Sequence, residues 1–224
     1  MKITVLGTGM VGRAMAEKLL SLGHQVAMGT RDPEKTKAFQ KDNFSFQDWL
    51  SANPVNLTTF VDAAAQAETM VINCTAGMIS MDALNMAGTA NLKGKVLLDI
   101  ANPLDFSKGQ PPFLNPGNTD SLGEQIQAAF PETHVVKSLN TMNCYLMVNP
   151  ALIAGEHNVF VSGNDEAAKE QVKTLLNSFG WNRDNILDLG DITGARATEQ
   201  LLPIWLKLWA AKGTPMFNFG VVMG

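Results

Sequence analysis

The sequence predicts an α/β fold built on a doubly wound parallel sheet. Short, nearly continuous apolar runs alternate with helix-forming segments along most of the chain, as in sheets that are covered on both faces. The first of these runs, residues 1–6, leads directly into a glycine-rich turn and a helix. At 224 residues the chain is long enough for one large α/β domain with an appendage.

The glycine-rich turn has the form G-x-G-x-x-G between a strand and a helix, which is the dinucleotide-binding fingerprint of Rossmann folds. We expect Gly7 to allow the tight turn, Gly9 to let the backbone approach a pyrophosphate, and Gly12 to let helix and strand pack closely. The pyrophosphate would lie on the free N–H groups of the new helix. The alternative is a glycine-rich turn without a ligand. The residues assigned to the dinucleotide here are Gly7, Thr8, Gly9, Met10, Val11 and Gly12.

The end of the second strand, residues 25–29, indicates which dinucleotide binds. An NAD enzyme normally has Asp or Glu near this point, to bind the ribose 2′-hydroxyl. This chain has Thr30 and Arg31, with Lys35 one helical turn further on. A hydroxyl and a guanidinium can hold a 2′-phosphate, and the lysine adds a second charge. The pattern favours NADP over NAD, the alternative being a solvated basic face.

Asp32 is the carboxylate nearest to this position, and it could in principle bind a 2′-hydroxyl instead. It is followed by Pro33, and Asp at the N-cap with Pro at the first helical position is a favoured helix start. We therefore expect the Asp32 carboxylate to turn toward backbone N–H groups and away from the ribose.

The rest of the first 150 residues repeats the same alternation. A loop with Phe44, Phe46 and Trp49 precedes the third strand, and the Pro- and Gly-rich residues 102–120 form another loop. Ser121 and Glu124 have the spacing of a capping box at a helix start. The expected strands are residues 56–59, 69–74, 95–100 and 134–139, and the expected helices are residues 33–40, 60–66, 79–86 and 121–130.

The chain keeps this α/β rhythm after residue 150. Strands are expected at residues 158–161 and 186–189, with a helix over residues 166–179 between them. A long helix over residues 194–212 should kink or split at Pro203, which lacks a backbone N–H. Residues 216–222 look extended. We expect an NADP-binding domain over residues 1–150 and a small C-terminal lobe over residues 151–224 that covers the active site.

Ligands of doubly wound sheets bind outside the carboxyl ends of the strands. Small residues at 75–77 would let a nicotinamide ribose lie against the backbone, and the amides of Asn102 and Asn140 could orient a ring. For each asparagine the alternative is a turn residue or a helix cap. The candidate residues at these strand ends are Cys74, Thr75, Ala76, Asn102, Pro103, Asn140 and Thr141.

The sequence offers no set of acid–base residues for this site. The only tyrosine, Tyr145, is followed four residues later by Asn149, so there is no Tyr-x-x-x-Lys pair. His24, His134 and His157 each precede a strand, and we expect surface histidines at the end of the sheet away from the site. There is no Gly-x-Ser-x-Gly elbow and no cluster of metal ligands. Hydride transfer fits such a site, because it needs mainly alignment and closeness of two rings.

Composition excludes several other classes. The net charge is −4 without basic clustering, which argues against nucleic acid as a partner. The sequence contains no run of 18 apolar residues, so no membrane span is expected. The chain opens on a strand without a signal-peptide pattern. The two cysteines, Cys74 and Cys144, lack metal-site spacing and are expected to be buried thiols in a reducing cytoplasm.

Several segments together resemble the F420-dependent NADP reductases, and the resemblance spans nearly the whole chain. The sequence around Asn140 is also similar to the cytosolic reductase domain of the six-transmembrane metalloreductases. Some archaeal members of the F420-dependent family carry His where this chain has Asn140. The segments that carry the resemblance are residues 7–12, 29–31, 137–141 and 194–199 and the Phe-Asn-Phe-Gly sequence at 217–220.

The resemblance implies that NADP(H) lies on the Rossmann half, with a deazaflavin stacked on its nicotinamide. The family's 2′-phosphate residues fall on Thr30, Arg31 and Lys35, and its nicotinamide loops on residues 74–76 and 102–103. The implied function is hydride transfer between NADPH and a flavin-like coenzyme such as F420. Free flavin, a ferric chelate or a small carbonyl or imine are alternative acceptors. A non-catalytic NADP(H) sensor with a protein partner is the alternative of another class.

The C-terminal helix is apolar almost all round, which core packing explains only in part. A buried interface between two copies explains the rest, so a homodimer is expected. The apolar residues concerned are Leu201, Leu202, Ile204, Trp205, Leu206, Leu208 and Trp209.

Overall fold

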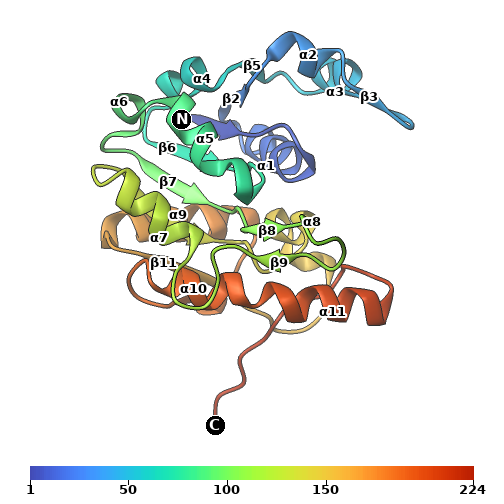
Figure 1. Cartoon of the computed structure of the whole chain (residues 1–224), viewed down its shortest axis with the longest axis vertical. Helices are drawn as coiled ribbons and strands as arrows, with labels where there is room; N and C mark the ends of the chain where they lie inside the picture. The colour runs from blue at the N-terminus through green and yellow to red at the C-terminus, as the bar shows by residue number, and fades with distance from the viewer.

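A single sheet of eight strands organises the computed structural model, which describes residues 1–224 (Figure 1). The strand order is β12-β11-β10-β7-β6-β1-β2-β5, with all neighbours parallel except the antiparallel pair β10–β11. This confirms the predicted doubly wound α/β fold. The strands are β1 (Lys2–Leu6), β2 (Gln25–Thr30), β5 (Asn56–Thr59), β6 (Met70–Asn73), β7 (Val96–Asp99), β10 (His134–Ser138), β11 (Val159–Gly163) and β12 (Ile186–Asp188).

Helices cover both faces of the sheet, and a separate apolar cluster fills each interface. Helices α1, α8 and α9 pack in the first cluster, and α4, α5, α7 and α10 in the second. The helices are α1 (Met10–Ser21), α2 (Pro33–Lys37), α3 (Phe46–Ala52), α4 (Phe60–Gln66), α5 (Gly77–Ala87), α6 (Thr89–Leu92), α7 (Leu122–Ala129), α8 (Cys144–Val148), α9 (Glu166–Phe179), α10 (Gly194–Gln200) and α11 (Leu202–Lys212). Two 3-10 turns, η1 (Pro150–Leu152) and η2 (Arg183–Asn185), complete the set.

Local sequence signals set several helix boundaries as predicted. The Asp32 carboxylate accepts a 2.9 Å hydrogen bond from the backbone N–H of Lys35 and so caps α2. Ser121 caps α7 by accepting from the N–H of Glu124 at 3.1 Å. Pro203 splits the C-terminal helix, because α10 ends at Gln200 and α11 begins at Leu202.

The segment between α2 and β5 differs from its prediction as a loop. It forms a short hairpin of β3 (Gln40–Lys41) and β4 (Phe44–Ser45), followed by α3. The Ser45 hydroxyl caps α3, and Phe46 anchors the segment because its ring is buried in the core. The helix predicted over residues 33–40 therefore ends early, at Lys37. A second hairpin, β8 (Leu104–Asp105) with β9 (Phe113–Leu114), lies in the predicted loop 102–120.

The antiparallel direction of β11 shows that the expected position of one histidine, His157, was wrong. Because β11 runs antiparallel to β10, its first residues lie beside the carboxyl ends of the parallel strands, and His157 lies there with them. His157 is also buried: its Nε2 lies 3.1 Å from the carbonyl oxygen of Pro150, and its Nδ1 accepts from the Asn218 amide at 2.9 Å. His24 and His134 lie at the opposite end, as expected.

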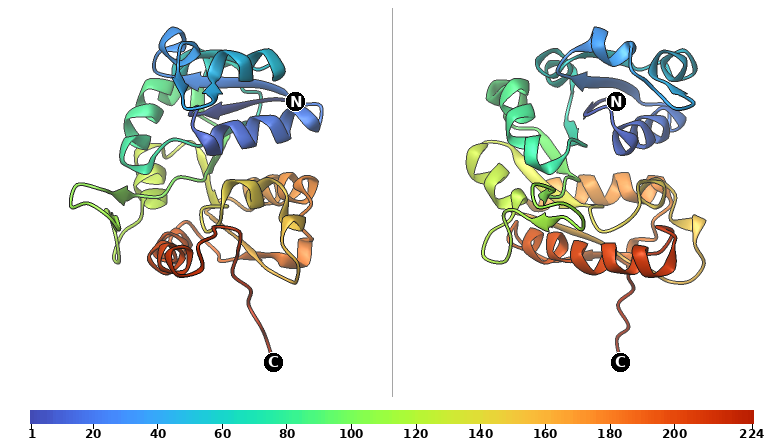
Figure 2. Two further views of the ribbon diagram at one scale, coloured as in Figure 1. Left: turned by 90° about the vertical axis from the view of Figure 1, so that its right-hand side faces the viewer. Right: turned by 45° about the vertical axis from the view of Figure 1, so that its right-hand side comes forward.

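The C-terminal third extends the same sheet with β11 and β12 and ends in a segment without regular structure. Figure 2 shows that the last residues project away from the body of the molecule, and Val222 is 96% exposed. No helix combines the length and the apolar character that crossing a membrane requires. The division of the chain into two domains at residue 150 stays a prediction.

Candidate functional site

The glycine loop between β1 and α1 leaves open space where a phosphate group could lie. Gly7 has φ +107°, and a Cβ there would lie 2.7 Å from the Cys74 carbonyl oxygen. A Cβ on Gly12 would lie 2.1 Å from the carbonyl oxygen of Gly7, so only glycine allows this packing. Gly9, in contrast, has no neighbouring atom within 4 Å of its Cβ position. The space faces the start of α1, whose first N–H groups have no partner within the helix. This geometry fits a pyrophosphate.

A cavity of about 670 Å³ opens beside this loop, and its lining holds four basic side chains and two carboxylates, Asp32 and Asp42. It is lined by Thr30, Arg31 and Lys35, the three residues assigned to a 2′-phosphate, and by the loop residues Thr8, Gly9 and Met10. Lys41 and Arg13 also line it, and the sequence analysis missed both. The β3–β4 hairpin places both residues at the cavity. Lys41 is on β3, and the Arg13 guanidinium lies 4.0 Å from the ring centre of Phe44 on β4.

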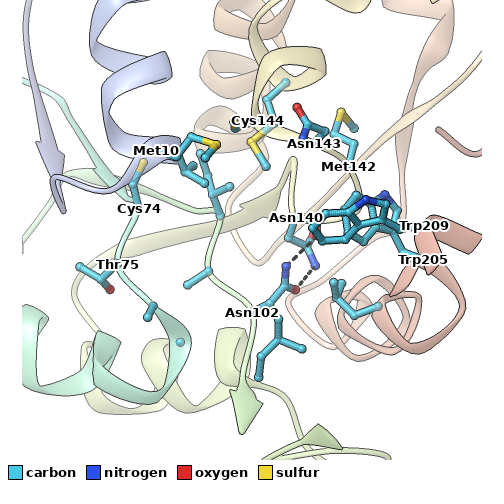
Figure 3. Close-up of a pocket in the computed structure, with 18 of the residues that line it drawn as sticks. Met10, Cys74, Thr75, Asn102, Asn140, Met142, Asn143, Cys144, Trp205 and Trp209 are labelled. Carbon is cyan, nitrogen blue, oxygen red and sulfur yellow. Dashed lines mark hydrogen bonds between the residues drawn. The ribbon is translucent and has the colours of Figure 1, made fainter. Parts of the chain in front are cut away.

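A second cavity, of about 350 Å³, lies at the carboxyl ends of β6, β7 and β10 (Figure 3). Figure 3 shows Cys74 and Thr75 on one side of it and Trp205 and Trp209 on the other. Of the predicted residues, Met10, Val11, Cys74, Thr75, Ala76, Asn102 and Asn140 line it, whereas Pro103 and Thr141 do not. Cys144 on α8 and the cavity face of α11 also line it, and the sequence analysis assigned neither of them to the site. The spacing of Trp205 and Trp209, four residues apart on a helix, indicates that they share a face.

Asn102 and Asn140, which follow the carboxyl ends of β7 and β10, form two hydrogen bonds with each other. The Asn102 amide nitrogen donates to the backbone carbonyl of Asn140 at 2.8 Å, and the Asn140 amide nitrogen donates to Asn102 Oδ1 at 3.0 Å (Figure 3). The residue before Asn140, Leu139, has φ +64°, a conformation that side chains with a Cβ rarely adopt. Residues with a strained backbone conformation of this kind are frequent at functional sites.

The cavity contains no acid or base that titrates near neutral pH. Its lining is mainly apolar and has no Asp, Glu, Lys, Arg or His side chain. Burial raises the pKa of the Cys74 thiol, and the nearby charge of Asp99 raises it further. Burial also raises the pKa of Cys144. Both thiols are therefore protonated, and the cavity offers apolar surface and amide groups.

A buried ionic cluster lies behind this cavity. The Lys137 ammonium contacts Asp99 at 2.8 Å and Glu199 at 2.7 Å and also donates to the carbonyl of Ala101. The side chains of Lys137 and Asp99 are fully buried, and that of Glu199 is 3% exposed. Glu199 accepts in addition from two backbone N–H groups at the start of α7. Burial alone would lower the pKa of Lys137, but Asp99 and Glu199 outweigh it and raise the pKa.

Hydrogen bonds connect this cluster to the cavity wall. Asn73 donates to Asp99 Oδ1 at 2.8 Å and accepts from the hydroxyl of Thr75 at 2.7 Å. Ser80 completes the network with a contact of 2.8 Å to the same hydroxyl. The network therefore holds the loops that follow β6 and β7, which form one wall of the cavity.

The C-terminal tail holds α11 against the cavity. Phe217 stacks on Trp205 with ring centres 5.5 Å apart, and Trp209 packs on the same indole at 5.3 Å. The Asn218 amide donates to His157 and to the backbone carbonyl of Asn158. The Phe-Asn-Phe-Gly segment therefore positions the tryptophan side of the cavity.

Comparisons with known proteins show which proteins this chain is similar to. The family model described as NADP oxidoreductase, coenzyme F420-dependent, matches residues 2–103. A crystal structure from Arthrobacter sp. FB24, described as a candidate F420-dependent NADP reductase, is 58% identical over all of both chains with a TM-score of 0.95. The F420-dependent NADP reductase of Methanothermobacter marburgensis is 28% identical over 93% of this chain and 92% of its own.

The chain is also similar to part of a longer protein. Metalloreductase STEAP3 of Rattus norvegicus is 26% identical over 210 residues. The match covers 91% of this chain but 38% of the metalloreductase, so the chain spans less than two fifths of that protein's length.

Proposed function

The chain belongs to the F420-dependent NADP oxidoreductase family and is an NADP-dependent oxidoreductase, and we propose that it transfers a hydride between NADPH and a flavin-like coenzyme such as F420. One observation carries the proposal: an uncharged, largely apolar cavity adjoins the glycine loop at the strand ends. Such a cavity suits two flat rings that must stack closely.

We assign the parts of NADP(H) to the two cavities. The loop Gly7–Gly12 would hold the pyrophosphate, and Thr30, Arg31 and Lys35 the 2′-phosphate. The nicotinamide, which supplies the hydride when the cofactor is bound, would lie against residues 74–76, with residues 102–103 and 140–141 beside it. The protein's own contribution is to orient the rings and exclude water, because hydride transfer depends mainly on closeness and alignment.

Arg31 should decide the preference for NADPH. We expect Arg31→Ala to weaken NADPH binding by about 1.5–3 kcal/mol, as for loss of a charge-assisted hydrogen bond, and to leave NADH binding nearly unchanged. Calorimetric titration with both cofactors measures this. Lys37→Ala is the control, because Lys37 pairs with Glu34 on the same helix and does not line the cavity. Equal losses for NADPH and NADH would rule out the assignment.

The hydride step should not depend on pH. The only side chains lining the second cavity that can ionise are the thiols of Cys74 and Cys144, whose pKa values are raised. Stopped-flow measurement with saturating NADPH, checked with deuterated cofactor, should give a constant rate between roughly pH 6 and 9. A bell-shaped profile that disappears on mutation of one residue would mean that an acid or base takes part.

The choice of acceptor separates this proposal from its alternatives. Steady-state oxidation of NADPH with F420, FMN, a ferric chelate and simple carbonyls or imines ranks the acceptors directly. A non-catalytic NADP(H) sensor would bind NADPH and reduce none of them. The segments 102–120 and 194–220 could have filled the acceptor space in a sensor, but the 350 Å³ cavity remains open between them, which supports the enzyme.

We also propose that two copies associate through α11. Ile204 and Trp209 on this helix are 51% and 44% exposed, and the apolar tail residues Val222 and Met223 are 96% and 82% exposed. Large apolar side chains exposed together are typical of an interface. Sedimentation equilibrium of the purified chain would decide between monomer and homodimer.

A further inference from the structure

The amide of Asn140 can have only one orientation. Its backbone carbonyl requires a donor, so Asn102 must turn its amide nitrogen toward it. Asn102 Oδ1 then faces Asn140 and accepts from the Asn140 amide nitrogen. Turning either amide over would place two oxygens or two NH₂ groups together. One backbone carbonyl therefore fixes both side chains, and Asn140 Oδ1 is left as a pure acceptor.

This acceptor has no partner within the chain. Asn140 is 2% exposed and lines the second cavity, yet its Oδ1 makes no hydrogen bond. Leaving a buried amide oxygen unpaired costs free energy, which a partner supplied by a ligand would recover.

The same cavity is lined by a residue whose hydrogen-bond donor also lacks a partner. Trp205 is 8% exposed, and its indole N–H, which can only donate, also has no partner. Phe217 and Trp209 pack on the indole and hold it in place. Both atoms are themselves buried, and they belong to residues that line the same cavity, so a ligand that reaches them would meet one unpaired acceptor and one unpaired donor.

We propose that Asn140 Oδ1 and the Trp205 N–H together recognise an N–H group adjacent to a carbonyl on the bound ligand. The proposal rests on the proposed function, in which two molecules carry this unit: nicotinamide in its carboxamide, and a flavin or deazaflavin in its imide. Trp205 is then a binding residue, and Asn102 is a positioning residue that acts by fixing the Asn140 amide. A ferric chelate or a simple ketone offers no such N–H.

Ligand analogues that lack the N–H test this proposal. The first arm compares binding of NADPH with its 3-acetylpyridine analogue, in which a methyl group replaces the carboxamide NH₂. The second compares 8-hydroxy-5-deazariboflavin with its N3-methyl derivative, in which the imide hydrogen is lost. We expect the wild-type protein to bind the altered ligand about tenfold more weakly in one of the two arms, and that arm identifies the recognised molecule.

Variants show whether these residues cause the discrimination. Asn140→Ala should bind parent and analogue within about twofold of each other, and Asn102→Ala should do so as well, because it frees the Asn140 amide to turn over. Trp205→Phe, which keeps a ring against Phe217, should bind the parent ligand about tenfold more weakly. Asn177→Ala is the matched control: its amide nitrogen also donates to a backbone carbonyl, that of Trp181 at 3.0 Å, but Asn177 lines neither cavity. It should keep the wild-type discrimination.

The outcomes separate this inference from the proposed function. Equal binding of parent and analogue in both arms, or discrimination that persists in Asn140→Ala, overturns the recognition pair. Failure of the deazaflavin to bind or to be reduced overturns the proposed acceptor instead, while the NADPH arm still decides the inference. Thermal unfolding of each variant identifies any that lose binding through loss of the fold.

Discussion

Replacing Lys137 with methionine is expected to lower the free energy of unfolding by about 3–5 kcal/mol, the usual cost of removing one member of a buried ion pair. The ammonium lies between Asp99 and Glu199 and is fully buried with Asp99. Its removal leaves two buried carboxylates without their cation. The hydrogen bonds from Asn73 to Asp99 and from the start of α7 to Glu199 compensate only in part.

Chemical denaturation of the variant measures this loss, and Lys169→Met is the matched control. The Lys169 side chain is also buried, at 3% exposure, and pairs with Glu166 and Asp188. Those carboxylates are 80% and 29% exposed, so water solvates them when the lysine is removed. The control should therefore lose only about 1 kcal/mol. If the two variants were equally stable, the ionic cluster would not be a significant part of the core.

The pKa of Lys137 sets the pH range of this effect. Its folded-state pKa is raised, so its stabilisation is complete below the unfolded-state pKa of about 10.4 and is lost as the pH rises through the folded-state value. The contribution of Lys137 to the stability of the wild type should therefore be constant from roughly pH 6 to 9.

The first βαβ unit could be predicted closely because local rules determine it. The glycine spacing, the Asp32–Pro33 helix start and the placement of Thr30 and Arg31 each depend on a few neighbouring residues. The same is true of the break at Pro203. Where the structure depends on short-range chemistry of this kind, sequence and structure agree.

The ionic cluster could not be predicted, because it depends on which strands become neighbours. Lys137 and Asp99 are 38 residues apart in sequence and meet only because β7 and β10 are adjacent. The antiparallel direction of β11, which moves His157 to the other end of the sheet, has the same origin. The β3–β4 hairpin was missed for another reason: strands of two residues are too short to show an alternating pattern.

The candidate cavity was predictable in part. Its strand-end residues follow from a general rule about parallel sheets, and that rule located Asn102 and Asn140. It could not show that the two amides bind each other, because that contact joins two loops. Nor could it place Trp205, which reaches the cavity only through the packing of α11 and the C-terminal tail.

Replacing Gly9 with valine is expected to weaken NADPH binding at least about 100-fold, or roughly 2.7 kcal/mol, without loss of the fold. Gly9 has φ −70° and ψ −174°, which valine adopts readily, and no atom lies within 4 Å of its Cβ position. The protein itself therefore has room for the new side chain. The space that it would fill is the one assigned to the pyrophosphate, so the cost should fall on the ligand.

Gly12→Val provides the contrast that makes this result interpretable. At Gly12 the Cβ would lie 2.1 Å from the carbonyl oxygen of Gly7, so that variant should lose stability before any question of binding arises. Circular dichroism and thermal unfolding should find Gly9→Val folded like the wild type, while calorimetry detects little NADPH binding. Because the pyrophosphate is common to both cofactors, NADH binding should be lost in parallel, unlike in Arg31→Ala. Wild-type affinity for NADPH in folded Gly9→Val would mean that the dinucleotide does not lie on this loop, and the assignment of both cavities would fail with it.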